Sequence, residues 1–328
     1  MRAALVKVFG PPSSLVVEHV ADPVPGEGQV LIDVAAASVN FPDLLVVDGT
    51  YQHLPTRPFS PGKEAAGYVT AVGPGVERLS VGQRVLALVE YGAYAEKLVV
   101  AEELVMPIPD SMTFVDAAAC GLVYSTAHLG LFRRGGLRAG ETALITGAGG
   151  GVGSAGVQLA KAAGARVIAL VHDDTRAKLA LRLAADVVLT SSPETLRDDI
   201  LAATDGRGVD VVLETLGADY FAPIVRATAW EGRIVVVGFA AGGQNPIKPG
   251  HLLVKNISVL GLQSSDYHDR MADLVHTAMG EVFDLFGKGL LDACVDVTFP
   301  LERASEALQY VKDGKVAGKV VVTTGAES

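Results

Sequence analysis

Residues 144–153, with the sequence LITGAGGGVG, constrain the fold of this chain more than any other segment. An apolar run leads directly into glycines, and a helix-like segment begins immediately after them. Glycines at such a turn allow a tight change of direction and let backbone N–H groups approach a pyrophosphate at the positive end of a helix. A second apolar run follows at residues 166–171. The segment therefore predicts the first strand, turn and helix of a dinucleotide-binding domain.

The residues of this turn and of the next strand end decide which dinucleotide is expected. The predicted turn contacts are Ala148, Gly149, Gly150, Gly151, Val152 and Gly153. The strand at 166–171 does not end in the acidic residue that NAD-specific sites use for the ribose. Arg176 could bind the 2′-phosphate of NADPH as a planar, bidentate donor. Asp173 and Asp174 are alternative ribose partners, so NADPH is favoured and NADH remains possible.

Apolar runs and helix-like segments alternate from residue 141 onward. Strands are expected at 142–146, 166–171, 186–189, 209–214, 233–239 and 257–262. Helices are expected at 152–163, 175–183, 194–203 and 220–229. Continuously apolar strands that are each followed by a helix indicate a parallel sheet covered on both faces. This part of the chain is predicted to be an α/β, doubly wound Rossmann domain.

The flanking regions have a different texture. Short strand-like runs separated by proline and glycine, such as 29–35, 65–72 and 84–88, predict a mainly β, partly rolled-up sheet in the first part of the chain. After residue 264 an amphipathic stretch, a helix at 301–312 and a strand at 319–323 are expected to rejoin that sheet. The predicted domains are 1–120 with 265–328, and 121–264.

Composition excludes several classes of protein. The chain has 328 residues, whereas single domains usually stop growing near about 250 residues, so it is long enough for two hydrophobic cores. The formal net charge of −10 disfavours nucleic acid as a partner. Two distant cysteines, Cys120 and Cys294, predict a reducing compartment. No uncharged apolar run approaches the roughly 20 residues of a membrane span, and the first apolar run is too short for a signal peptide. We expect a cytoplasmic protein with no membrane partner.

A series of ordered motifs extends along the chain. They are SVNFPD at 38–43, GTY at 49–51, PGKEAAG at 61–67, VGQRV at 81–85, GAYAE at 92–96, GF at 238–239 and AGKV at 317–320. Together with the glycine turn they resemble the zinc-free quinone oxidoreductase branch of the medium-chain dehydrogenase/reductases, which includes zeta-crystallin. The resemblance covers essentially the whole chain. It implies a Rossmann domain inserted in a mainly β, GroES-like catalytic domain.

The resemblance also predicts that no metal is bound. Zinc-dependent members place a cysteine where Asn40 stands and a histidine where Lys63 stands, and a further cysteine near Leu122. Catalytic zinc needs three nitrogen, sulfur or oxygen ligands, which these three side chains do not supply. The segment 91–105 also has no cysteine for a structural zinc.

The resemblance implies a nicotinamide in a cleft between the domains, lined by the predicted catalytic residues Asn40 and Tyr51. Asn40 would donate an amide N–H to the carboxamide or the substrate oxygen, and Tyr51 its hydroxyl to a quinone or enone carbonyl. Leu45 stands where some quinone reductases have a second tyrosine. Further implied cofactor contacts, besides Asn40, are Thr126, Gly238, Phe239, Ala240, Gly318 and Lys319. His53 could line the pocket, whereas Lys63 and Glu64 are either a functional cation with its neighbour or an ion pair.

The predicted function is reduction of a small quinone by NADPH. Reduction of an activated carbon–carbon double bond in an enal, enone or enoyl thioester is the alternative, because the same fold serves both. A non-catalytic, NADPH-binding structural or regulatory protein is the alternative from another class. The apolar segment 257–262 at the expected sheet edge predicts a homodimer formed through the edge strands of the Rossmann domain.

Overall fold

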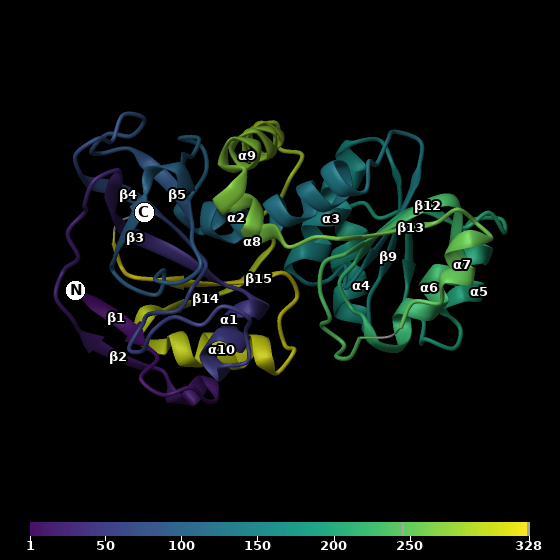
Figure 1. Ribbon diagram of the computed structural model, residues 1–328, viewed down its shortest axis with the longest axis horizontal. Helices are drawn as coiled ribbons and strands as arrows, with labels where there is room; N and C mark the ends of the chain where they lie inside the picture. Colours follow the sequence, from purple (N-terminus) through teal and green to yellow (C-terminus); the bar gives the residue numbers. More distant parts are fainter. Residues whose placement is uncertain (245, 327–328) are drawn as a thin grey trace. The chain divides into compact units, whose positions relative to one another are not determined.

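The computed structural model describes residues 1–244 and 246–326, and its contacts divide the chain into two compact units (Figure 1). Unit 1 comprises Met1–Leu122, Ser265–Gly287 and Ala293–Ser328. Unit 2 comprises Val123–Ser264 and Lys288–Asp292. The last segment groups with unit 2 because the backbone N–H of Asp292 donates to the Gln158 side chain at 2.7 Å.

Unit 2 is built on a six-stranded parallel sheet. Its strands are β8 (Thr142–Thr146), β9 (Arg166–Leu170), β10 (Val187–Leu189), β11 (Val209–Glu214), β12 (Thr228–Val236) and β13 (Ser258–Gly261). They lie in the order β10-β9-β8-β11-β12-β13, and all neighbouring pairs are parallel. The first strand of the unit therefore lies beside the fourth, which is the doubly wound Rossmann order. The predicted fold class is confirmed.

Helices follow the strands of unit 2. The first four correspond to the helices that the apolar pattern predicts, whereas the fifth was not expected. They are α3 (Gly151–Ala162), α4 (Asp174–Arg182), α5 (Leu196–Ala203), α6 (Phe221–Ala227) and α7 (Pro249–Leu253). Leu144, Ile168, Val212 and Ile234, on four neighbouring strands, are completely buried in the core. A sheet covered on both faces needs apolar residues at successive positions, which explains the continuous apolar runs.

Several predicted boundaries in unit 2 differ from the structure, and the largest error lies at β12, which also ends at Val236 rather than at residue 239. The helix expected at 220–229 ends at Ala227, and β12 begins at Thr228 rather than at residue 233. Thr228 pairs with Val209, and the ladder then shifts register before Arg233 pairs with Val211. Glu231 has a φ of 56° within this irregularity. The bulge separates the two halves of the strand and hides the first half from a pattern-based prediction.

Unit 1 contains a seven-stranded sheet, a two-stranded sheet and helices. The larger sheet consists of β3 (Gln29–Val39), β4 (Glu64–Val72), β5 (Arg84–Leu88), β6 (Lys97–Ala101), β7 (Val105–Pro107), β14 (Val295–Pro300) and β15 (Lys319–Thr323). The remaining strands and helices are β1 (Arg2–Leu5), β2 (Val16–His19), α1 (Phe41–Asp48), α8 (Ser264–Arg270), α9 (Ala272–Gly287) and α10 (Ala304–Lys312). Val320 of β15 pairs with Val39 of β3, so the end of the chain joins the sheet formed by its beginning.

A long apolar helix carries the chain from unit 1 to unit 2. It comprises α2 (Phe114–His128) and a π-helical continuation, Leu129–Arg134. By length and composition alone this is the one helix among the described residues that could cross a membrane. However, 83% of its most apolar window is buried inside the protein, as in the core helix of a soluble fold.

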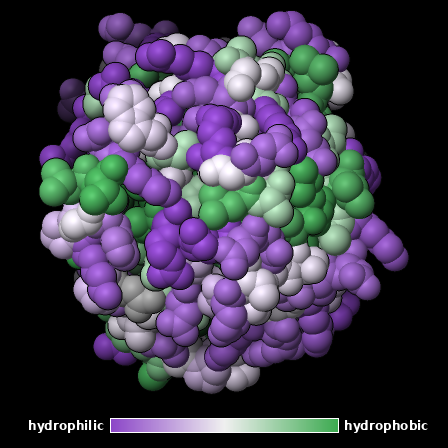
Figure 2. Space-filling model, turned by 90° about the vertical axis from the view of Figure 1, so that its right-hand side faces the viewer, coloured by the Kyte–Doolittle hydropathy of each residue, from purple (hydrophilic) through white to green (hydrophobic). Residues whose placement is uncertain are grey.

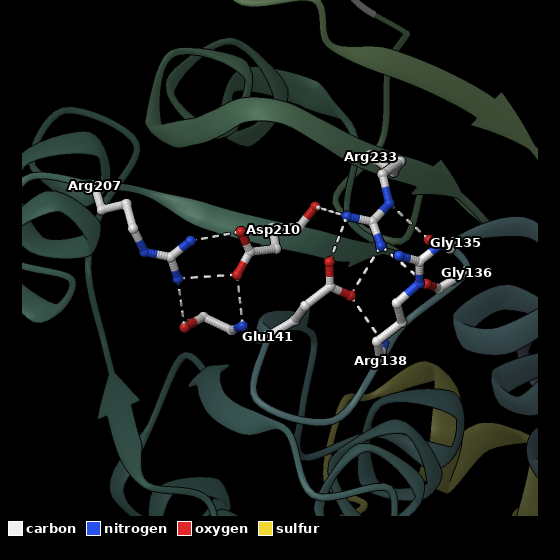
Figure 3. Close-up of polar contacts among 8 residues, drawn as sticks. Gly135, Gly136, Arg138, Glu141, Arg207, Asp210 and Arg233 are labelled. Carbon is white, nitrogen blue, oxygen red and sulfur yellow. Dashed lines mark hydrogen bonds and ion pairs between the residues drawn. The ribbon is translucent and has the colours of Figure 1, made fainter.

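A polar network joins the segments that precede β8 with Arg233, which follows the bulge in β12 (Figure 3). The Arg233 guanidinium donates to both carboxylate oxygens of Glu141 at 2.9 Å each. It also donates to the carbonyl oxygens of Gly135 and Gly136, each at 2.9 Å. Arg233 thus ties the loop that follows α2 to the sheet at the amino end of β8.

The outer face of unit 2, shown in Figure 2, is mainly hydrophilic, with apolar side chains in small separate groups. The edge strand β13 pairs with β12 and, among the described strands, with no other. Ser258 and Gly261 at its two ends are exposed. An exposed parallel edge strand presents unpaired backbone groups to another chain.

Candidate functional site

The turn between β8 and α3 has the conformation that a bound pyrophosphate requires. Gly147 has a φ of 59°, in the left-handed region that favours glycine, and its carbonyl oxygen accepts the Gly150 N–H at 2.9 Å. A Cβ on Gly153 would overlap that same carbonyl oxygen of Gly147. Glycine at position 153 therefore lets α3 pack directly on the turn, as in dinucleotide-binding folds.

The N-terminus of α3 offers unpaired donors. The N-cap residue, Gly150, has no side chain to accept from the helix. The first backbone N–H groups of a helix, here from Gly151, Val152 and Gly153, have no partner within the helix. They point toward an anion placed beyond the helix end and share its partial positive charge. Ala148 to Gly153 lie at the carboxyl end of β8, next to β11, where the strand order reverses and ligands bind in such sheets.

Arg176 lies directly on this turn. A Cβ on Gly149 would collide with the Cβ, Cγ and Cδ atoms of Arg176, so the arginine stem fills the space beside the glycine. Asp173 is the N-cap of α4; its carboxylate accepts the Arg176 N–H at 2.8 Å and also pairs with the guanidinium. These hydrogen bonds from Arg176, backbone first, hold the pKa of Asp173 below its ordinary value. A 2′-phosphate would have to compete with Asp173 for this guanidinium.

The other predicted cofactor contacts of unit 2 occupy two places. Gly238, Phe239 and Ala240 follow the carboxyl end of β12, where the Ala240 N–H donates to the Thr215 carbonyl at 2.9 Å. The Phe239 side chain is 43% exposed and free to contact a ligand. Thr126, on α2, is buried, and its hydroxyl donates to the Ser264 hydroxyl at 3.0 Å.

Glu214 is a buried acid that the sequence analysis does not single out. It ends β11, and one carboxylate oxygen accepts the N–H groups of Leu216 and Gly217 at 2.8 and 2.9 Å. The other oxygen has no partner among the described residues. Burial raises the pKa of Glu214. The only signal in the sequence is an acid at the end of a continuously apolar strand; in the structure it fixes the loop after β11, beside the glycine turn's strand.

The two predicted residues Asn40 and Lys319 lie together in unit 1. The Asn40 amide donates to Glu64 at 2.8 Å and to the Ser38 hydroxyl at 3.2 Å. Its oxygen accepts from the Lys319 ammonium at 2.6 Å. Asn40, Lys319 and Glu64 are 5%, 3% and 0% exposed. The amide expected to donate to cofactor or substrate is therefore fully engaged within unit 1, and the Lys319 ammonium points inward.

Local structure explains how these residues reach one another. Asn40 is the N-cap of α1, where its backbone N–H donates to the buried carboxylate of Asp43 at 2.8 Å. Burial raises the pKa of Asp43 to about 6. Gly318 has a φ of 114°, and a Cβ there would overlap the Cys294 carbonyl oxygen. Glycine at 318 therefore lets β15 begin with Lys319 against β3.

Lys63 and Glu64 do not pair with each other. Glu64 faces Lys319 at 3.4 Å, while the Lys63 ammonium donates to the Glu90 carboxylate at 2.6 Å. The same ammonium lies 4.5 Å from the centre of the Tyr51 ring. Glu64 is the first residue of β4 and Lys63 immediately precedes it, and the two neighbours serve different partners.

Tyr51 is half-buried in the loop that follows α1 and packs against the core of unit 1. Its backbone N–H donates to the Leu45 carbonyl at 3.1 Å, which fixes the loop. Within the described residues its hydroxyl makes no hydrogen bond, so it can donate to a ligand. His53, two residues later, is exposed.

His268 is a second residue that the sequence analysis does not single out. It lies in α8, is 7% exposed, and its Nε2 has no hydrogen-bond partner among the described residues. Burial lowers the pKa of His268 to about 4, against the opposing influence of Glu90 and Glu64. Nothing in the spacing of the seven histidines distinguishes it from the others.

Comparison with known proteins identifies relatives over the whole chain. Residues 26–110 match the alcohol dehydrogenase GroES-like domain, and residues 151–279 match the zinc-binding dehydrogenase family. Quinone oxidoreductase-like protein 2 from mouse is 34% identical over 98% of this chain and 92% of its own length. A mycobacterial protein complexed with NADPH superposes with a TM-score of 0.92, at 32% identity, over 98% of this chain and all of its own. The enoyl reductase CurK superposes with a TM-score of 0.88, at 27% identity, over 98% and 99% of the two chains.

The fold and the glycine turn define an oxidoreductase with a Rossmann-type site for a nicotinamide cofactor. The chain belongs to the quinone oxidoreductase-like family of the medium-chain dehydrogenases/reductases.

The residues present do not fit the zinc that the name of the zinc-binding dehydrogenase family implies. Across residues 1–244 and 246–326, no three His, Cys, Asp or Glu side chains are grouped so that they could hold a metal ion. Asn40 is saturated by Glu64, Ser38 and Lys319, and Lys63 is itself a cation paired with Glu90. By contrast the glycine turn, with its unpaired N–H groups, fits the pyrophosphate of a dinucleotide.

Proposed function

We propose that this protein reduces quinones to hydroquinones with NADPH as the electron donor. The observation that carries the proposal is Tyr51, whose hydroxyl has no hydrogen-bond partner among the described residues. The residue is half-buried, and its ring centre lies 4.5 Å from the buried ammonium of Lys63. Of the two predicted catalytic residues it is the one whose donor is available, because the Asn40 amide is engaged. The mouse relative's name and the NADPH-complexed neighbour support the same reaction class.

In the proposed reaction NADPH supplies a hydride, and unit 2 binds and orients it. The pyrophosphate is held by the N–H groups of Gly151, Val152 and Gly153. Arg176 gives up part of its pairing with Asp173 and binds the 2′-phosphate. Phe239, with its exposed ring after β12, contacts the cofactor at the carboxyl edge of the sheet.

Unit 1 is proposed to bind the quinone through Tyr51. The tyrosine hydroxyl donates a hydrogen bond to a carbonyl oxygen of the quinone and gives it a proton as negative charge develops there. The buried group of Asn40, Glu64 and Lys319 positions the β3–α1 junction from which the Tyr51 loop continues. Quinone, NADPH and one proton yield hydroquinone and NADP⁺.

Reduction of a conjugated carbon–carbon double bond is the second candidate, favoured by the similarity to an enoyl reductase. The same hydroxyl would then donate to the carbonyl oxygen of an enone or enoyl thioester, where the enolate charge develops. The two reactions differ in where the hydride arrives, at the quinone or at the β-carbon of the alkene.

The deciding experiment follows NADPH oxidation at 340 nm, under anaerobic conditions, against a panel of quinones, enals and enones. We expect the kcat/KM for 9,10-phenanthrenequinone to be at least tenfold higher than that for any enone of similar size. The reverse order would support double-bond reduction. Tight NADPH binding without turnover of any compound would support a non-catalytic role and contradict the proposal.

A further inference from the structure

Lys63 places a positive charge inside unit 1, immediately before β4. Its side chain is 2% exposed, and its carbonyl oxygen accepts the Val89 N–H at 2.8 Å. A buried ammonium is costly unless its charge and its N–H groups are compensated. The contacts of this ammonium therefore show what the charge acts on.

Two of those contacts are with Glu90. The Lys63 ammonium donates to the Glu90 carboxylate at 2.6 Å and to the Glu90 carbonyl oxygen at 3.3 Å. Burial opposes ionisation of Glu90, but the interactions with Lys63 and then with Ser265 outweigh it and lower the pKa of this carboxyl group. Glu90 thus fixes the position of the ammonium, although the Glu90 side chain is itself one-third exposed.

The third contact is the aromatic face of Tyr51, whose centre lies 4.5 Å from the Lys63 nitrogen. At this distance a cation is attracted by the negative face of the ring, and more strongly when it is removed from water. The cation also draws electron density from the ring, which strengthens the phenol O–H as a hydrogen-bond donor. Lys63 thus lies over the ring face, while within the described part of the chain the hydroxyl has no hydrogen-bond partner.

We propose that Lys63 is a positioning and electrostatic residue for Tyr51: it holds the ring in place and strengthens the hydroxyl as a proton donor to the quinone oxygen. The inference rests on the proposed function. In the step, the quinone takes up the hydride supplied by NADPH and a proton from Tyr51, giving hydroquinone and NADP⁺. Tyr51 then regains its proton from solvent.

A double-mutant cycle separates this role from that of a structural ion pair. We compare wild type, K63M, Y51F and K63M/Y51F, with K63R as the conservative variant, using NADPH and 9,10-phenanthrenequinone. The matched control is K315M, because Lys315 is an exposed lysine of the same unit, 60% accessible and paired with Asp313 at 2.9 Å.

We expect K63M to lower kcat five- to tenfold with less than a twofold change in the KM for NADPH. In the Y51F background the same substitution should change kcat less than twofold. K63R should retain at least half the wild-type kcat, and K315M should match wild type. An equal loss in both backgrounds, or no loss in K63M, would overturn the inference.

A spectroscopic measurement tests the contact without turnover. Removing a cation from the ring face should produce a tyrosine difference spectrum near 285 nm between K63M and wild type, and none between K63M/Y51F and Y51F. If wild type reduces no quinone but the difference spectrum is present, the proposed function fails while the Lys63–Tyr51 relationship stands. If quinone is reduced but the spectrum and the kinetic coupling are absent, the inference fails and the proposed function stands.

Discussion

The side chain of Arg176 occupies the space that a Cβ on Gly149 would need, so an arginine from α4 closes one side of the glycine turn. The pairing of its guanidinium with Asp173 places a cation and an anion together where the adenosine ribose of a dinucleotide is expected. The choice between NADPH and NADH therefore depends on the balance between these two side chains.

Replacing Arg176 with glutamine should weaken NADPH binding at least tenfold and leave NADH binding within threefold, because one charged hydrogen-bonding group is lost. D173N should have the opposite effect and increase the preference for NADPH, since it removes the negative charge that competes with the 2′-phosphate for the guanidinium. Dissociation constants from isothermal titration calorimetry measure both. R182Q is the control, because Arg182 is exposed and lies 3.6 Å from Asp292. Equal losses for both cofactors in R176Q would show that Arg176 does not read the phosphate.

Gly153 should not tolerate a side chain. In G153A the added Cβ would overlap the Gly147 carbonyl oxygen and force α3 away from the turn. We expect a loss of about 2 kcal/mol or more in the free energy of unfolding and of most dinucleotide affinity. G280A is the matched control, because a Cβ at Gly280 in α9 meets nothing within 4 Å. That variant should be neutral or gain up to about 1 kcal/mol. Urea unfolding that shows equal stability for both variants would contradict this view of the turn.

The ion pair of Arg233 and Glu141 should contribute measurably to the stability of unit 2. Both side chains are about one-quarter exposed, and Arg233 also satisfies two carbonyl oxygens. R233M should therefore cost about 2 kcal/mol. R197M, which removes an exposed partner of Asp198, should cost less than about 0.5 kcal/mol. Chemical unfolding followed by circular dichroism compares the two, and similar losses would show that the network adds nothing beyond a surface pair.

The same network gives a direction for the effect of pH. Burial opposes ionisation of Glu141, but hydrogen bonds from Arg233 and the Arg138 N–H outweigh it and hold the pKa below its ordinary value of 4.5. A carboxyl group whose pKa is lower in the folded state stabilises above its unfolded pKa and loses that effect as the pH falls. R233M should thus be destabilised less, relative to wild type, at pH 3.5 than at pH 7.

His268 should make unit 1 sensitive to acid. Its folded pKa of about 4 lies below the ordinary 6.5, so the unfolded chain binds a proton more readily between these values. Stability is lost as the pH falls through this window, by roughly 2–3 kcal/mol at most. Asp43 acts in the opposite direction, because its raised pKa lets the folded state bind a proton first. The effect of His268 must therefore be measured as the difference in pH-dependent stability between wild type and a variant that lacks this histidine.

The charged groups that act on His268 are Glu90, Glu64 and Lys63. In H268L, the fall in unfolding free energy between pH 7 and pH 4.5 should be smaller than in wild type by 1–3 kcal/mol, from the same linkage. H172L alters an exposed histidine, and its unfolding free energy should fall by the same amount as that of wild type between these two pH values. Parallel curves for wild type and H268L would show that the His268 ring reaches water.

The exposed strand β13 leads us to predict a homodimer. The Leu262 N–H donates to the Val236 carbonyl at 3.0 Å, and the two-residue period of a strand then directs the Val259 N–H to the free edge. Wild type should show twice the 34.0 kDa chain mass in light scattering at micromolar concentration, and V259P the mass of one chain. A monomeric wild type would contradict the prediction.

The sequence predicts the strands of this protein better than its polar contacts. The bounds of β5, β8, β11 and β15 coincide with the expected ones, because each is an apolar run with breakers or charges at its ends. The short helix α1 was not expected, since its only marks are an N-cap asparagine and a proline in the first turn. Local patterns report burial and periodicity, which such a short helix hardly shows.

The contacts that the predicted site residues make with one another could not be predicted from the sequence. Asn40 and Lys319 meet although 279 positions separate them, and Glu64 joins them from a third segment. Motifs identified all three segments, but only the fold shows that the Asn40 amide is used up within the protein. His268 and Glu214 are distinguished only by being buried with one polar atom that has no hydrogen-bond partner among the described residues. The spacing of residues in the sequence does not indicate this.

The network of Arg233 and Glu141 lies at the amino ends of the strands, whereas the glycine turn and Arg176 lie at the carboxyl ends of the same sheet. Substitutions that alter the choice of dinucleotide therefore touch none of the contacts that tie the other edge together. The preference between NADPH and NADH and the stability contributed by Arg233 and Glu141 can therefore be altered by separate substitutions at the two ends of one sheet.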